Sequence, residues 1–217
     1  MVGQSGKVVG LDFDAVMLSM AKSLGPDVEW HEGDLQNLPF ADDLFDLVIC
    51  QQGLQFLADP AAGLRQIYRV LRPSGRVVLA IWTELAKSPG HAVLFRALGT
   101  LLGTNKPPAA WSLAEEALVL KLVSAAGFVD VETKTTNLRT TFPSARRFVE
   151  IMIGGSSKLT RQALAQIPAD QKAAFIDDVA ARLRGYETGA TLELPMESRL
   201  LASHKPQAQP SLDDGTP

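Results

Sequence analysis

The chain has 217 residues, 46% of them hydrophobic, which is enough to bury the core of one globular domain. A formal charge of −3 and a pI near 5.6 give no electrostatic reason to expect nucleic acid or an anionic membrane as a partner. The single cysteine, Cys50, excludes an internal disulfide. The first residues lack the apolar core of a signal peptide, and no apolar run approaches the roughly 20 residues of a membrane helix. Together these features predict a cytoplasmic protein.

The first 82 residues alternate between short apolar runs and amphipathic segments. Lys7–Leu11 is predicted to be a buried strand, and Asp14 can cap the helix that follows it. Glycine and proline at 25–26 end that helix. The apolar positions predicted on its buried side are Val16, Met17, Met20 and Leu24.

The same alternation continues to Trp82. Val28–Glu32 and Asp46–Cys50 are predicted as the second and third strands, and Arg76–Trp82 as a strongly apolar fourth. Pro60 opens a helix that the sequence Pro-Ser-Gly at 73–75 stops. Strands that are separated by crossovers of helix length imply a mainly parallel sheet with helices on both faces.

The second half has a different pattern. A capping-box pattern at Ser112 and Glu115 predicts a helix that ends at Gly127. Strand-like runs at 128–137 and 191–202 could pair antiparallel at a sheet edge. The segments 143–152 and 170–184 between them are predicted to be helical and to form a lid.

These elements predict one α/β domain over residues 1–203. Its core would span 7–137, its helical lid insertion 138–190 and its antiparallel edge strand 191–202. The polar, proline-bearing segment 204–217 is predicted to be a disordered tail.

Acidic residues stand where the first strand ends. A carboxylate at Asp12 could accept both hydroxyls of a ribose that lies over the strand tips. The alternative is that Asp12 or Asp14 simply caps the next helix, although one of the two can cap while the other binds. Phe13 and Met17 could contact an adenine, or they could belong to the core.

Asp34 follows the second strand within the sequence GDLQNLPF. From there it could accept the exocyclic amine of an adenine, with the amide of Leu35 as a second contact. Taken alone, a turn-forming Asp after Gly33 is the stronger interpretation.

The order and spacing of several motifs add to this interpretation. The segments GLDFD, GDLQNLPFADDLFDLVI and VLRPSGRVVLA resemble those of class I S-adenosylmethionine-dependent methyltransferases, and especially the branch that includes the ubiquinone/menaquinone C-methyltransferases. The resemblance implies a Rossmann-like fold with S-adenosylmethionine as cofactor. It implies that Asp12 holds the ribose, that Asp34 and Leu35 hold the adenine, and that Gln51 faces the cofactor near its sulfonium.

The sequence departs from this family at its start. The family pattern opens with a strand, a glycine-rich turn and a helix, whereas this sequence begins after all three. The segment 3–7 does not replace the turn, because it precedes a strand instead of following one. Losing the central strand would open two strand edges or force the neighbouring strands to pair. Losing two hydrogen bonds to the methionine end, at roughly 1.5–3 kcal/mol each, would weaken binding by two or more orders of magnitude.

Methyl transfer depends on positioning and desolvation, so the sequence assigns no catalytic residue. Gln51, Gln52 and Gln55 could line the floor of the site. His91 is predicted to lie on a surface loop, with a role as general base as the alternative. Three arginines near the lid are predicted to be solvated, with an acidic substrate as the alternative partner; they are Arg139, Arg146 and Arg147. No cluster of residues has metal-ligand spacing.

Three functional hypotheses follow. The first is methyl transfer to a small-molecule acceptor, with no nucleic acid or membrane partner, impaired in this chain by the absent glycine-rich turn. The second is a non-catalytic relative that serves as a binding or interaction module. The third, a nicotinamide-dependent oxidoreductase that uses Asp12 for the ribose, fits the motifs GDLQNLPF and LRPSGR poorly. The sequence leaves the oligomeric state open.

Overall fold

The structure is a computed structural model that describes residues 2–3, 5–25, 27–104, 109–156 and 158–207. The helix stop predicted at Pro26 and the end of the predicted tail, residues 208–217, lie outside this range. The chain divides into two compact units, which are described separately. Unit 1 comprises residues 1–80, 116–133 and 200–217, and unit 2 comprises residues 81–115 and 134–199.

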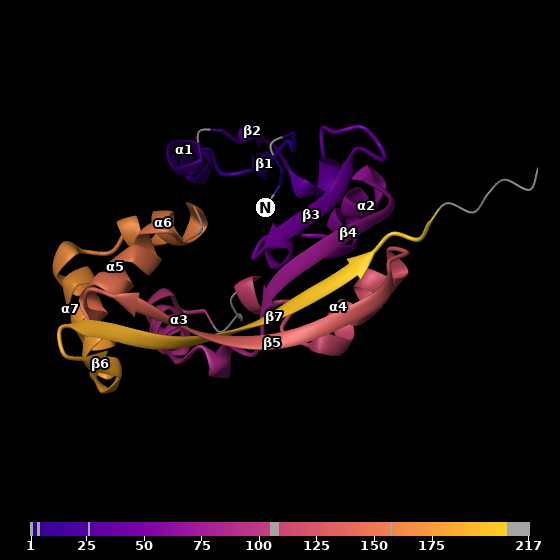
Figure 1. The fold of residues 1–217 in the computed structure, drawn as a ribbon. Helices are drawn as coiled ribbons and strands as arrows, with labels where there is room; N and C mark the ends of the chain where they lie inside the picture. The colour runs from indigo at the N-terminus through magenta and orange to yellow at the C-terminus, as the bar shows by residue number, and fades with distance from the viewer. Residues whose placement is uncertain (1, 4, 26, 105–108, 157, 208–217) are drawn as a thin grey trace, which may run out of the picture. The chain divides into compact units, whose positions relative to one another are not determined.

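Unit 1 begins with a parallel strand pair (Figure 1). Strand β1 (Val9–Asp12) pairs with β2 (Glu29–Glu32), and helix α1 (Ala15–Leu24) connects them. A Cβ at Gly10 would lie 2.3 Å from the ring of Trp30, so only glycine lets the indole pack on β1. The indole Nε1 of Trp30 donates to the carbonyl of Gly25 at 2.9 Å, which fixes the ring over the strand.

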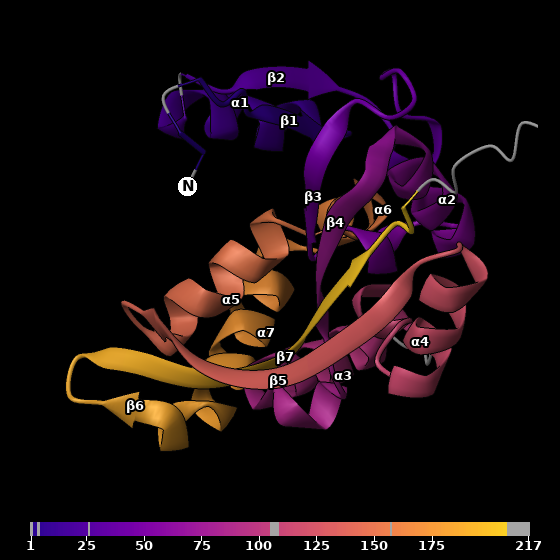
Figure 2. The same ribbon diagram turned by 45° about the vertical axis from the view of Figure 1, so that its right-hand side comes forward.

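A second sheet contains the longer strands. Strand β3 (Phe45–Gln51) pairs in parallel with β4 (Leu71–Trp82) after helix α2 (Pro60–Val70), in the order that the sequence predicts. The predicted stop at 73–75 was wrong, because the helix ends at Val70 and β4 begins at Leu71, so the Pro-Ser-Gly sequence lies within the strand. The strand order is β3-β4-β7-β5, with β7 (Thr191–His204) and β5 (Val129–Phe142) next to each other (Figure 2). Of the two strands expected at a sheet edge, β5 takes the end of this order and β7 lies inside it. The prediction that disorder begins at residue 204 was wrong, because β7 runs through His204 and Lys205 is held by hydrogen bonds.

The two sheets are separate in the described residues, so the strand neighbouring β1 is β2 and the strand neighbouring β3 is β4. Of the two outcomes predicted for the missing central strand, the structure therefore has open edges. The side of α1 predicted to be buried is exposed, and Leu24 is 85% accessible. That prediction was wrong because the helix packs mainly on the short strands β1 and β2, and Leu18 is its one buried residue.

Helix α4 (Glu116–Ala125) packs on α2 within unit 1. Gly127 ends the segment after α4 with a φ of +96°, and a Cβ there would lie 3.0 Å from the ring of Tyr68. The predicted glycine stop is thus confirmed for two reasons, the left-handed backbone and the close approach of the ring. Phe128 then meets Tyr68 edge to face, with ring centroids 5.2 Å apart.

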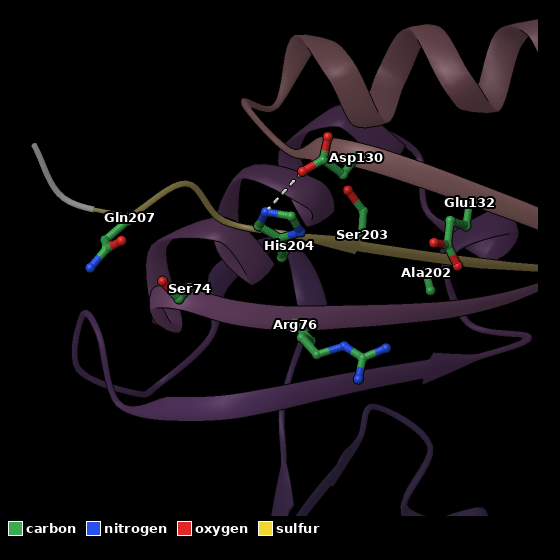
Figure 3. Close-up of a pocket in the computed structure, with 8 residues that line it drawn as sticks. All are labelled: Ser74, Arg76, Asp130, Glu132, Ala202, Ser203, His204 and Gln207. Carbon is green, nitrogen blue, oxygen red and sulfur yellow. Dashed lines mark ion pairs between the residues drawn. The ribbon is translucent and has the colours of Figure 1, made fainter.

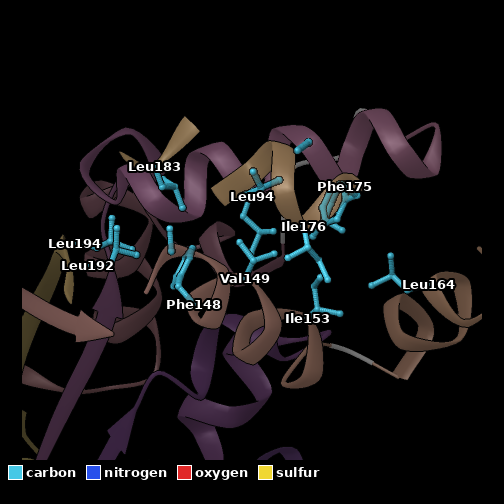
Figure 4. Packing of buried hydrophobic residues seen from close by; sticks show 14 residues of the cluster. Leu94, Phe148, Val149, Ile153, Leu164, Phe175, Ile176, Leu183, Leu192 and Leu194 are labelled. Atoms are coloured by element: carbon cyan, nitrogen blue, oxygen red, sulfur yellow. The ribbon is translucent and has the colours of Figure 1, made fainter. Parts of the chain in front are cut away.

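Unit 2 contains a helical core (Figure 4). Helices α3 (Pro89–Leu102), α5 (Ala145–Gly154) and α7 (Ala169–Arg182) pack together with α6 (Lys158–Ala165). Phe148, Val149 and Val179 are fully buried there, beside Leu192 and Leu194 of β7. The two predicted lid helices correspond to α5 and α7. The short elements are β6 (Glu187–Thr188), which pairs antiparallel with β7, and the 3₁₀ turns η1 (Leu35–Asn37), η2 (Leu54–Phe56), η3 (Leu85–Lys87), η4 (Ala109–Trp111) and η5 (Arg184–Tyr186).

Lys205, the residue after β7, hydrogen-bonds to the C-terminal end of α2 in unit 1. Its Nζ donates to the carbonyl oxygens of Tyr68 and Leu71 at 3.1 and 2.8 Å and to the carboxylate of Asp43 at 2.6 Å. The side chain is only 14% exposed. The ammonium therefore satisfies one carbonyl group in the last turn of α2 and one just after the helix ends.

We expect Lys205→Met to lower the free energy of unfolding by about 2 kcal/mol, because hydrogen bonds to a charged group are lost and buried carbonyls lose a partner. Urea unfolding measures this loss. Lys121→Met on the exposed side of α4 is the control and should change stability by less than about 0.5 kcal/mol. Equal stability of the two variants would contradict the role of Lys205.

Candidate cofactor site at the carboxyl ends of β1 and β2

The carboxyl ends of β1 and β2 bring two acidic residues to one edge. Asp12 is the last residue of β1 and is in register with Glu32, the last residue of β2. The amide of Gly33 donates to the carbonyl of Asp12 at 3.0 Å, so the chain stays beside β1 as it turns towards Asp34. Ligands of parallel α/β folds bind at this edge of the sheet.

The two acids near the end of β1 have separate roles. Asp14 caps α1, because its Oδ1 accepts the amides of Val16 and Met17 at 2.8 and 3.3 Å. The cap predicted at Asp14 is confirmed. Asp12 lies half-buried and accepts the amide of Asp14 through Oδ1 at 2.8 Å. That single bond orients the carboxylate of Asp12 and occupies one of its two oxygens.

Asp34 caps the η1 turn. Its Oδ1 accepts the amide of Gln36 at 2.8 Å, and the side-chain amide of Gln36 reaches Oδ2 at 3.2 Å. The turn-forming role, which is the stronger interpretation of Asp34 when that residue is considered by itself, is therefore confirmed. The carboxylate is also exposed at the strand edge, and Leu35 stands half-buried beside it as the first residue of η1.

Phe13 and Met17 are exposed, Phe13 by 75%. The alternative that places them in the core is therefore wrong, because α1 and the loop before it turn these side chains away from the β1–β2 pair. An exposed phenyl ring next to Asp12 offers an apolar face at the same edge.

Gln51 lies apart from these residues in the topology, because it ends β3 in the other sheet. The next residue, Gln52, has a left-handed φ of +53°, a strained conformation for a residue other than glycine. The buried side chain of Gln55 donates to Oε1 of Gln52 at 2.7 Å. Residue identity carries no sign of this backbone strain, so the sequence did not reveal it.

The donor set fits the adenosine part of a nucleotide cofactor. Two carboxylates at adjacent strand ends can accept hydrogen bonds from a ribose diol and from an adenine amine. For the methionine end of such a cofactor, the described residues offer fewer hydrogen-bonding groups. The turn in which Gly6 donates to the carbonyl of Gly3 precedes β1 and does not follow a strand. The described residues contain no group of three or more His, Cys, Asp or Glu that could hold a metal ion.

A hollow of about 510 Å³ lies elsewhere in unit 1 (Figure 3). Its lining includes Ser74 and Arg76 at the amino-terminal part of β4, together with Asp130 and His204, whose Oδ2 and Nε2 lie 3.3 Å apart. Because this is the opposite end of β4 from the carboxyl edge, the hollow does not take the place of the site at Asp12 and Asp34.

His91 is a buried helix residue. The surface-loop prediction was wrong, because His91 lies in α3 and only 5% of it is exposed. Burial lowers the pKa of His91 from 6.5 to about 4, so the ring is neutral near pH 7. The error arose because the helical signal of 89–102, with Pro89 at its first turn, was not recognised.

The other groups singled out in the sequence have structural explanations. Cys50 is half-buried in β3, and burial raises the pKa of its thiol, in keeping with an unreactive residue. Each of the three lid arginines has a carboxylate partner: Arg139 pairs with Glu193, Arg146 with Asp177 and Arg147 with Glu150.

Comparison with known proteins gives consistent matches. Residues 1–79 match the family model described as a methyltransferase domain. A demethylmenaquinone methyltransferase of Lactobacillus johnsonii is 40% identical over 117 residues, 48% of each chain. A chloroplastic 2-phytyl-1,4-beta-naphthoquinone methyltransferase of Arabidopsis thaliana is 33% identical over 154 residues, 66% of this chain and 58% of the relative. The chain thus spans about half the length of these curated relatives.

Solved structures share the fold. The YcgJ protein of Bacillus subtilis superposes with a TM-score of 0.58 at 16% identity, over 93% of this chain and 83% of that one. Phosphoethanolamine N-methyltransferase 2 of Haemonchus contortus, solved with S-adenosyl-L-methionine, has a TM-score of 0.53 at 18% identity, over 93% of this chain and 44% of that one. These neighbours confirm the predicted α/β, Rossmann-like fold. None of the described helices is long and apolar enough to cross a membrane.

The lowered pKa of His91 predicts a dependence of stability on pH. Above pH 6.5 the folded and unfolded states both carry a neutral His91, and between pH 6.5 and 4 only the unfolded state gains a proton. Stability is therefore lost as the pH falls, by about 2 kcal/mol between pH 7 and pH 5 from this residue.

Urea unfolding at both pH values measures this loss, and His91→Phe is the comparison. We expect the variant to lose about 2 kcal/mol less than the parent chain between pH 7 and pH 5. Parallel losses in the two proteins would mean that His91 titrates normally in the folded state.

Proposed function

We propose that this chain, which belongs to the class I S-adenosylmethionine-dependent methyltransferases, takes part in methyl transfer from S-adenosylmethionine to a small-molecule acceptor. The observation that carries the proposal is the pair of carboxylates, Asp12 and Asp34, at the carboxyl ends of two adjacent parallel strands. Other supports are the family match over residues 1–79 and the fold neighbour solved with this cofactor.

Asp12 would hold the ribose. Its Oδ1 is engaged with the amide of Asp14, so the carboxylate is orientated before a ligand arrives. Asp34 and the Leu35 amide would hold the adenine, and Phe13 would cover one side of it. Gln51 would face the cofactor near its sulfonium. When bound, S-adenosylmethionine supplies a methyl group activated by the positive sulfur.

The chain's own contribution would be positioning and the exclusion of water. A methyl group attached to a sulfonium needs an aligned nucleophile more than it needs a fixed acid or base. For this reason no residue is assigned as catalytic. Gln52 and Gln55, joined by their side-chain hydrogen bond, would present polar groups to the acceptor from the end of β3.

A small molecule is the acceptor class we favour. The relatives include proteins named for demethylmenaquinone and for a phytyl naphthoquinone. The formal charge of −3 offers no general attraction for nucleic acid. A cytoplasmic location remains a prediction from the sequence.

We also propose that the 217 residues by themselves bind the cofactor weakly. The contacts named above cover its adenosine half, and the family's glycine-rich turn is not in this sequence. The open edge of β1 leaves the strand that carries Asp12 supported on one side. A binding or interaction module without catalysis is the second candidate, and the exposed apolar side of α1 favours it.

Asp12→Asn tests the ribose contact. We expect it to weaken binding of S-adenosylhomocysteine about tenfold, because a charged hydrogen-bond acceptor becomes neutral. A titration followed by amide NMR shifts can measure even millimolar affinities. Asp14→Asn is a matched control, since asparagine caps helices as well as aspartate does. Equal affinity of Asp12→Asn and the parent chain would refute the contact.

Calorimetric titration with S-adenosylmethionine tests the weak-binding proposal. We expect the dissociation constant of the 217-residue chain to exceed about 100 μM, two orders of magnitude above a micromolar site. Micromolar binding would overturn the proposal. Binding with no methyl transfer to any of a panel of phenols and quinols would favour the second candidate function.

A further inference from the structure

The side chain of Gln36, the middle residue of η1, bridges two parts of unit 1 that are far apart in the chain. Its Nε2 donates to the carboxylate of Asp34, at 3.2 Å from Oδ2 and 3.4 Å from Oδ1. Its Oε1 accepts the backbone amide of Asp59 at 3.0 Å. Asp59 is the N-cap of α2, so one side-chain amide joins the turn after β2 to the start of that helix.

The carboxylate of Asp34 is held twice by the same residue. Its Oδ1 also accepts the backbone amide of Gln36 at 2.8 Å. Asp34 is exposed, and an aspartate on the surface rotates broadly about its last torsion angle unless a neighbour fixes it. With both oxygens in contact with Gln36, the remaining lone pairs of the carboxylate are presented in a defined direction.

The other end of the bridge is fixed to α2. Asp59 caps the helix, because its Oδ1 accepts the amide of Ala62 at 3.1 Å. Gly63 is buried in the next turn, and a Cβ there would lie 2.4 Å from Leu57 and 3.5 Å from Leu35. This close packing places η1 directly against α2. Gln36 therefore connects Asp34 to a regular helix, which is a more precise support than a free loop.

We propose that Gln36 positions the carboxylate of Asp34 for the exocyclic amine of the cofactor's adenine and thereby sets the preference for an amine over a carbonyl at that place on the base. An ionised carboxylate only accepts hydrogen bonds, so it pairs with an amine and repels a carbonyl oxygen. The preference is greatest when the carboxylate is aimed at the base before the ligand arrives. Gln36 acts through Asp34, which makes it a positioning residue. The proposal rests on the proposed function, because it takes Asp34 as the adenine contact.

The test compares S-adenosylhomocysteine with S-inosylhomocysteine, its deaminated analogue, in which a carbonyl oxygen replaces the adenine amine. Titrations followed by amide NMR shifts measure both affinities. We expect the parent chain to prefer the adenine compound at least tenfold, because the carbonyl would face a carboxylate. Gln36→Leu should reduce this preference to less than threefold, because Asp34 loses the side-chain donor that orients it.

A second variant separates the orientation of Asp34 from the link to α2. Gln36→Glu keeps an acceptor for the amide of Asp59 but places a carboxylate against Asp34. We expect it to lose the preference as Gln36→Leu does. An unchanged preference in both Gln36 variants would overturn the proposal.

Gln66→Leu is the matched control. Gln66 is also half-buried, and its Oε1 accepts the amide of Leu38 at 3.2 Å, so it holds the other end of the same turn without contacting Asp34. We expect this variant to lower the melting temperature and to keep the tenfold preference. A loss of preference equal to that of Gln36→Leu would mean that the preference follows the stability of the turn, and it would refute the positioning role.

The outcome can be distinguished from that of the proposed function. Binding of S-adenosylhomocysteine with the same preference in the parent chain and in the Gln36 variants would refute the role of Gln36 and leave the proposed function standing. A parent chain that binds neither compound would count against the cofactor site itself, and with it against the positioning role.

Discussion

The parallel pairing of β1 with β2 is the constraint on which the candidate cofactor site depends. Parallel strands end at the same edge of a sheet, so Asp12 and the turn that holds Asp34 are neighbours although 22 positions separate them in the chain. The indole of Trp30, packed on Gly10, opposes any slip in register. A shift by one residue would turn every side chain of β1 to the other face and move Asp12 out of the site.

The break between the two sheets is the second determinant. In a parallel sheet, the side chains on both faces need to be covered by other elements. Apolar side chains next to the two open edges, at β1 and β3, lack this cover. Leu47 and Ile49 of β3 are exposed, as are the apolar residues of α1. Apolar surface beside an unpaired strand edge favours association between molecules, since such an edge can pair with another strand. It also explains why α1, a good amphipathic helix in sequence, buries only one residue.

Unit 2 illustrates a different balance. Its helices α3, α5 and α7 form an apolar core around Phe148, and buried polar atoms of His91 and Trp111 in the same unit have no hydrogen-bond partner among the described residues. Close approach within the unit is strict, because a Cβ at Gly90 would lie 2.4 Å from a methyl group of Leu194.

The sequence by itself determined the local structure and the type of fold. Asp14 predicted the cap of a helix, Pro60 predicted a helix start, and Gly127 predicted a helix stop. Each of these signals depends only on residues within a few positions in the chain. The motifs around Asp12 and Asp34 indicated the cofactor class, because each motif is a run of adjacent residues and can be identified without knowledge of the fold.

Only the tertiary structure decided which surfaces are buried. The amphipathic pattern of α1 could not say that no described element covers it, and the short segment around His91 could not reveal that this residue is buried. Burial depends on contacts between residues far apart in the chain, which no local pattern encodes. The strained backbone at Gln52 and the unpartnered atom of His91 are likewise properties of the packed molecule, and both escaped prediction for that reason.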